Sequence, residues 1–170
     1  MNPATVSLED LRPSIASQFQ SELAMLRRAI ELFPESLWLE GSPNRSWHIA
    51  YHALFYLHFY LAPSDAEFIA WPKHRPDYNY LGEPPRNPGH KPVIDVPYTA
   101  TELLEYADFC RAEIASRVAD IDLTAPSGFF WLPFDKLQLL FYNLRHLAHH
   151  TGQLAERLRT RAGIGLPWVR

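Results

Sequence analysis

Six of the eight histidines in this 170-residue chain fall in two short segments with helical patterns. In the second segment, His146 and His150 share a stripe with Asn143, Gln153 and Arg157, all within about 80° of one another on a helix. Leucines border this narrow polar stripe on both sides. Because unpaired imidazoles are costly in an apolar interior, a divalent metal ion bound by the stripe is the simplest explanation.

The histidine spacing suits the ligation of one cation. His146 and His150 are four residues apart, which places their Cβ atoms about 5–6 Å apart on adjacent turns. Both rings can then reach a metal at about 2.0–2.1 Å. The earlier segment offers His48 and His52 at the same spacing. His52 lies deeper among apolar residues, so we predict His52 as the third ligand and His48 as its substitute.

Other polar residues near the histidines in the helical pattern could assist metal or substrate binding. The pattern identifies no catalytic residue. Asn143 and Gln153 could orient a bound water or substrate, or hydrogen-bond the outward nitrogens of the ligand histidines. Arg157 could receive a carboxylate, or pair with a surface neighbour. His149 points about 90–100° away from His146 and His150, so we interpret it as a surface residue.

Four segments are predicted as helices, over about 13–33, 46–62, 99–121 and 134–162. Thr99 and Glu102 form a capping-box pattern at the start of the third, and Gly163 follows the fourth. No strand pattern is convincing. The sequence therefore predicts an all-α four-helix bundle that forms a single domain over 1–170, with long connections after the second and third helices.

The connection over about 63–97 holds eight of the fifteen prolines and four aromatic residues. So long a segment without a period is typical of a lid or binding loop. It could equally be a surface excursion held by its aromatic residues. The second connection carries Phe129, Phe130 and Trp131, which would form a costly exposed patch on a monomer. We expect them to cover the end of the bundle or to pack against a second copy.

Composition narrows the class of protein. A net charge of −3 offers no basic face for nucleic acid. The single cysteine, Cys110, cannot form an internal disulfide, and its apolar neighbours predict a core position. No signal-peptide pattern and no stretch of 18 apolar residues is present. We therefore expect a cytoplasmic protein that binds neither nucleic acid nor membrane.

The residues that carry a family resemblance are Ser46-Trp47 followed by His52, and His146-x-x-x-His150 running into Gly152-Gln153-Leu154. In these motifs the chain resembles the DinB/YfiT-like family of metal-binding four-helix bundles. The resemblance implies that His52, His146 and His150 hold one divalent ion per chain, which could be zinc, nickel, iron or manganese. It also implies a homodimer.

Three neutral histidines leave the charge of a divalent ion uncompensated and a coordination position open, which acidifies a bound water or thiol. Two reaction classes follow, hydrolysis and transfer with a thiol nucleophile. Thiol-dependent S-transferases and a mycothiol-dependent isomerase occur in the family. The resemblance therefore favours a transferase that acts on a small molecule with a low-molecular-weight thiol. A metal-dependent hydrolase and a non-catalytic bundle with a structural metal are the alternatives, and a cavity beside the metal would favour catalysis. In a further alternative no metal is bound, and the histidines hydrogen-bond to one another and to Asn143 and Gln153.

Overall fold

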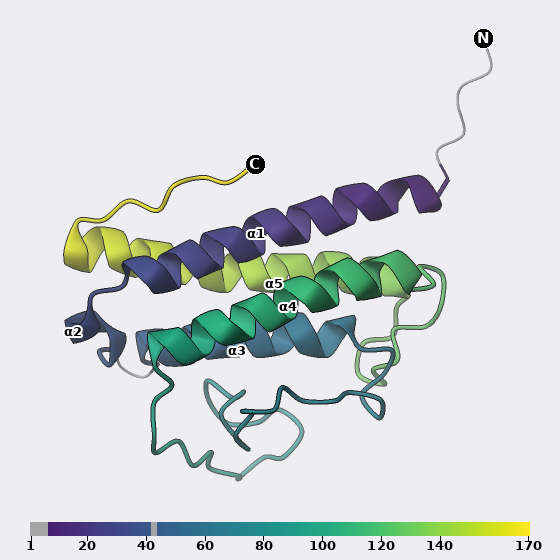
Figure 1. The fold of residues 1–170 in the computed structure, drawn as a ribbon. Coiled ribbons are helices and arrows are strands. Elements are labelled where there is room, and N and C mark those ends of the chain that lie inside the picture. Colours follow the sequence, from purple (N-terminus) through teal and green to yellow (C-terminus); the bar gives the residue numbers. More distant parts are fainter. Residues whose placement is uncertain (1–6, 42–43) are drawn as a thin grey trace.

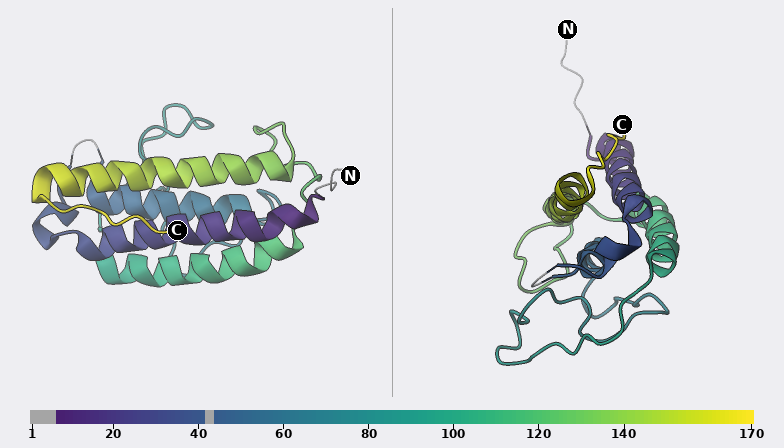
Figure 2. Two further views of the ribbon diagram at one scale, coloured as in Figure 1. Left: turned by 90° about the horizontal axis from the view of Figure 1, so that it is seen from above. Right: turned by 90° about the vertical axis from the view of Figure 1, so that its left-hand side faces the viewer.

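The computed structural model describes residues 7–41 and 44–170. Its four long helices are α1 (Arg12–Leu32), α3 (Ser46–Leu61), α4 (Ala100–Asp120) and α5 (Lys136–Arg157) (Figure 1). Each packs mainly against two neighbours, in the ring order α1, α4, α3, α5 (Figure 2). Within the described residues no strand is present. The predicted all-α four-helix bundle is confirmed.

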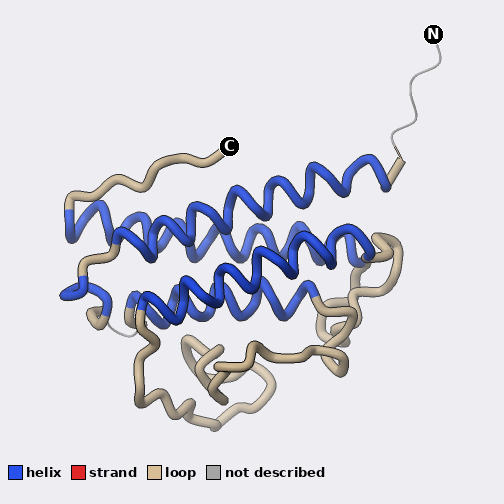
Figure 3. Tube along the Cα trace, in the orientation of Figure 1, coloured by secondary structure: helices blue, strands red, loops and turns tan. Residues whose placement is uncertain are grey.

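The directions of the helices explain the long connection after α3. In Figure 1, α3 and α4 run in the same direction, while α1 and α5 run opposite to both. Because α3 has 16 residues, it is about 24 Å long. The chain must return along this length before α4 can begin. The segment 62–99, which we call the crossover, makes that return below the bundle (Figure 3).

The helix ends follow the signals in the sequence. The capping box of Thr99 and Glu102 forms as predicted. The Asp135 side chain accepts a hydrogen bond from the Gln138 backbone N–H at 2.8 Å, so α5 begins slightly later than expected. A single π-helical turn, η2 (Leu158–Ala162), and Gly163 with a φ of 69° end this helix. The sequence pattern predicts neither η1 (Glu9–Leu11) nor α2 (Glu35–Trp38), because neither piece is long enough to show a period.

The core lies between the helices, and α3 is buried on nearly every side. This is why its sequence is apolar all round. Cys110 is completely buried on α4, where its Sγ lies 3.6 Å from the Leu54 carbonyl oxygen. The predicted core position of Cys110 is confirmed.

Aromatic residues fix both connections to the bundle. In the crossover, Trp71 is buried and stacks on Tyr106 of α4, with ring centroids 4.4 Å apart. The Tyr51 hydroxyl on α3 lies 2.6 Å from His74 Nδ1. In the second connection Phe129 is buried at the bundle end, whereas Phe130 is 84% exposed. No helix in the described part of the chain has the length and apolar character needed to cross a membrane.

Candidate metal centre

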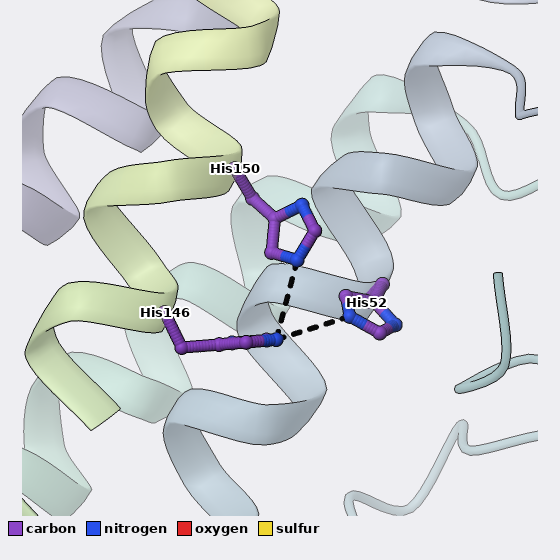
Figure 4. Close-up of side chains that lie close together, drawn as sticks. All are labelled: His52, His146 and His150. Carbon is purple, nitrogen blue, oxygen red and sulfur yellow. Dashed lines mark hydrogen bonds between the residues drawn. The ribbon is translucent and has the colours of Figure 1, made fainter. Parts of the chain in front are cut away.

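Three histidines meet between α3 and α5 (Figure 4). His52 extends from α3, and His146 and His150 extend from adjacent turns of α5. The Nε2 atom of His146 lies 3.2 Å from the Nε2 atoms of both His52 and His150. Ligand nitrogens of all three lie within 4.8 Å of one another. The packing of α3 on α5 thus joins residues that are about ninety positions apart in the chain.

Hydrogen bonds to the outer nitrogens fix the protonation of two of these rings. His52 Nδ1 lies 2.7 Å from the backbone carbonyl oxygen of Asn79 in the crossover. His150 Nδ1 lies 2.9 Å from the side-chain oxygen Oε1 of Gln153. A carbonyl oxygen only accepts, so each Nδ1 carries the proton and donates it. The Nε2 lone pairs of both rings therefore point at the common centre.

The surroundings keep the three rings uncharged at neutral pH. Burial lowers the pKa of His52 well below its usual value, and the two neighbouring histidines lower it further. Burial likewise lowers the pKa of His146 to about 3 and the pKa of His150 below its ordinary range. Neutral imidazole is the form that binds a metal.

The donor set fits a divalent cation. Neutral His52 and His150 cannot donate from Nε2, and His146 has only one Nε2 proton to share between them. The buried Nδ1 of His146 has no hydrogen-bond partner among the described residues. No neighbouring group therefore holds the ring proton of His146 on Nδ1. In a tetrahedral complex with bonds of about 2.0–2.1 Å, neighbouring nitrogens lie roughly 3.3–3.4 Å apart. The 3.2 Å separations approach that spacing.

The family model for the DinB superfamily matches residues 18–154, which include all three histidines. The chain belongs to the DinB superfamily. No curated protein matches it. The membership and the histidine cluster together are compatible with metal binding in this DinB-superfamily protein.

A cavity of about 480 Å³ opens beside the cluster, and His52 and His146 form part of its wall. We call it the aromatic cavity, because most of the remaining wall consists of Tyr56, Tyr60, Tyr80, Tyr142 and Trp131. The crossover lines one part of the wall with the stretch from Pro84 to Asn87. The crossover is therefore held to the bundle by its own aromatic residues, as one of the two interpretations expected, and it also lines the cavity.

Of the other candidates, Gln153 contacts the three-histidine cluster through the hydrogen bond to His150. His48 turns away from the cluster, and its Nε2 lies 2.8 Å from the Tyr78 carbonyl oxygen. The Asn143 amide is completely buried and donates to the Leu57 carbonyl oxygen at 3.0 Å. Asn143 thus joins α5 to α3 instead of orienting a histidine.

The remaining two candidates lie further along α5. The guanidinium of Arg157 lies 3.4 Å from the Ser46 hydroxyl at the start of α3, and within the described residues it has no carboxylate partner. His149 is exposed, as predicted, and its Nε2 accepts a hydrogen bond from the Gln153 amide at 3.2 Å. Gln153 is therefore held from both sides, which fixes the oxygen that it presents to His150.

Sequence reasoning missed most of the cavity wall. Tyr56 and Tyr60 follow His52 at four-residue intervals, and Tyr142 precedes His146 by four. These tyrosines continue the two histidine stripes, so the same helical spacing could have identified them. Tyr80 and Arg86 come from the crossover, which has no period that could have placed them.

Proposed function

We propose that this protein is a metal-dependent enzyme that transfers a low-molecular-weight thiol to a small molecule held in the aromatic cavity. The observation that supports it best is the position of the cavity, whose wall includes His52 and His146. A purely structural site would be closed by a fourth protein ligand. Among the described residues, no cysteine or carboxylate joins the three histidines.

The groups around the cluster favour a thiol over a water nucleophile. A divalent ion supplies Lewis acidity, which lowers the pKa of a thiol or of water. Water needs the larger shift, and an enzyme often assists its attack with a carboxylate base. No Asp or Glu belongs to the described wall of the cavity. Glu113 on α4 pairs with Arg117.

The thiol must come from outside the chain. Cys110 is completely buried, and burial raises the pKa of its thiol well above the ordinary value. The protein's own residues would supply the rest: three neutral imidazoles, the aromatic wall of the cavity, and the stretch of the crossover that lines it. In the transfer, the thiol sulfur forms a bond to an electrophilic carbon and displaces its leaving group, while the thiol proton goes to solvent.

Metal content and thiol transfer are the two measurements that test this proposal. Elemental analysis of the purified protein should give about one zinc, nickel, iron or manganese ion per chain. His150→Ala should lose the ion and keep its helical circular dichroism, whereas Glu113→Ala should keep the ion.

The loaded protein should then accelerate conjugation of 1-chloro-2,4-dinitrobenzene with at least one of cysteine, glutathione and mycothiol, and His150→Ala should not. Metal-dependent hydrolysis of 4-nitrophenyl acetate without any thiol conjugation would assign the site to the hydrolases instead. A bound ion with neither activity would favour a structural metal.

We also propose that the protein is a homodimer. The support is Phe130, whose ring is 84% exposed in a single copy. Sedimentation equilibrium should give twice the mass of one chain, and Phe130→Ser should weaken the association. A monomer at all accessible concentrations would contradict this proposal.

A further inference from the structure

The walls of the aromatic cavity are nearly all uncharged. Tyr56 and Tyr60 lie on α3 and Tyr142 on α5, and all three border the cavity with Trp131. Burial raises the pKa values of Tyr56 and Tyr60, so both phenols keep their protons at neutral pH. Aromatic walls favour a flat apolar molecule, because ring pairs gain energy in offset and edge-to-face arrangements. A cavity of about 480 Å³ is within the usual range for small-molecule sites.

Arg86 is the exception, since it is the only Arg, Lys, Asp or Glu in the described wall. Its Cζ lies 3.2 Å from the centroid of the Trp131 ring, a separation that requires the guanidinium to lie flat on the indole. Flat stacking uses the face of the guanidinium and leaves the N–H groups at its edge available. Arg86 thus presents a fork of donors at the cavity.

This fork has no acidic partner within the described residues. Glu83, which precedes Arg86 by three residues, accepts a hydrogen bond from the Gly89 backbone N–H instead. An exposed arginine usually finds a carboxylate or faces open water. Here the guanidinium is held against Trp131 beside a cavity that contains no negative charge of its own. A ligand can therefore supply the missing anion.

We propose that the aromatic cavity binds a small molecule with a flat apolar body and a carboxylate, and that Arg86 receives the carboxylate. The inference rests on the proposed function for the reaction and names the class of its substrate. A carboxylate matches the guanidinium in charge and in its two-pronged geometry. A carboxylate carries the single negative charge that one guanidinium pairs with, and no lysine and no second arginine lines the described wall.

Calorimetric titration with three ring compounds of similar size tests the proposal: phenylacetate, neutral phenylacetamide and cationic phenethylamine. Each is titrated into zinc-loaded protein and into protein stripped of metal with a chelator. We expect phenylacetate to bind most tightly of the three in both forms. Arg86→Met should weaken phenylacetate binding by roughly ten- to a hundredfold, the usual range for a lost charge-assisted hydrogen bond, and leave phenylacetamide unchanged.

Two further variants complete the design. Arg86→Glu should reverse the preference, so that phenethylamine binds better than phenylacetate. Arg111→Met is the matched control, because Arg111 lies on α4 outside the cavity wall and faces Asp108 at 3.5 Å. It should leave all three affinities unchanged. Arg86 is exposed, so its replacement should not prevent folding, and near-ultraviolet circular dichroism verifies this.

Three results would overturn the inference. Phenylacetate could bind equally well to wild type and Arg86→Met. It could bind only to the zinc-loaded form, in which case the metal is the anion site. Phenyl phosphate could bind more tightly than phenylacetate. Failure of the proposed function is a separate result. If the protein binds no metal but binds phenylacetate through Arg86, the carboxylate site is supported and the metal-dependent enzyme is rejected.

Discussion

The chain contains two pairs of histidines with the same four-residue spacing, and the structure uses them differently. On α5, His146 and His150 both turn toward one centre. On α3, His52 joins that centre, but His48 stacks on Trp47 and reaches the Tyr78 carbonyl oxygen. Spacing places two rings on one face of a helix. What each ring does is then decided by the segment that lies across from it.

For the α3 pair, that segment is the crossover. Consecutive carbonyl oxygens, from Tyr78 and Asn79, each take a hydrogen bond from one histidine of the pair. His48 thereby holds the crossover with Nε2, while His52 holds it with Nδ1 and keeps Nε2 for the cluster. One pair therefore serves both to fix a loop and to build a site.

The largest expected effect is a loss of zinc affinity that distinguishes the two histidine pairs. His150→Ala removes one of three converging nitrogens, so zinc affinity should fall by more than about a hundredfold, beyond the range seen for residues that only support a ligand. His48→Ala leaves the cluster complete and should keep zinc bound within about tenfold of wild type. Competition with a chromophoric chelator measures both, and equal losses in the two variants would reject the distinction.

The next effect concerns the hydrogen bond that orients His150. Gln153→Ala removes the acceptor of the Nδ1 proton, and zinc affinity should fall by roughly ten- to a hundredfold. Gln153→Glu supplies a stronger acceptor and should bind zinc at least as tightly as wild type. Gln20→Ala, which removes a half-buried glutamine on α1 that donates to the Arg111 carbonyl oxygen, is the control. If Gln153→Ala binds zinc normally, the bond has no role in orienting the ligand.

The third histidine of α3, His58, should make the stability of the metal-free protein depend on pH. Burial lowers the pKa of His58 to about 4 from an ordinary value of 6.5. Between these values the unfolded chain binds a proton that the folded chain does not, so this contribution to stability is complete above pH 6.5 and declines as the pH falls toward 4. Below about 4 it declines no further.

Urea unfolding of the metal-free protein between pH 4 and 7.5 measures this dependence. His58→Phe should reduce the slope by one proton, or about 1.4 kcal/mol per pH unit in the middle of the window. It should leave zinc affinity unchanged, because His58 contacts Tyr106 and not the cluster. An unchanged slope would show that His58 takes up its proton in the folded state.

The smallest effect belongs to the His48 contact with the crossover. His48→Leu leaves the buried Tyr78 carbonyl oxygen without its partner, and the free energy of unfolding should fall by about 1–3 kcal/mol. His48→Gln can still donate a hydrogen bond and should recover part of the loss. Thermal and urea unfolding give these values. A fully stable His48→Leu variant would mean that the bond does not hold the crossover.

The bundle and the histidine cluster could be predicted from the sequence by helical spacing, because both depend on which residues share a helix face. His52 and its distant partners on α5 were predicted on this basis, and their side chains meet. The same reasoning grouped Asn143 with the histidines, although its amide faces the Leu57 carbonyl oxygen. A stripe about 80° wide does not separate residues that face the neighbouring helix from those that face a cavity.

The crossover contributed what the sequence could not predict. The carbonyl oxygen of Asn79 and the guanidinium of Arg86 are placed by a path of prolines and buried aromatics, not by a repeating pattern. Every residue also has a backbone carbonyl group. The residue type therefore does not indicate which carbonyl accepts a hydrogen bond, whereas the Gln153 side chain is visible in the sequence.

This contrast between Asn79 and Gln153 affects how the site can change over generations. The group that orients His52 belongs to the main chain, so a point mutation at position 79 leaves that acceptor in place as long as the crossover keeps its path. The group that orients His150 is a side chain, and one nucleotide change can delete it. His52 and His150 are thus sensitive to different kinds of mutation: insertions and deletions in the crossover for His52, and single substitutions for His150.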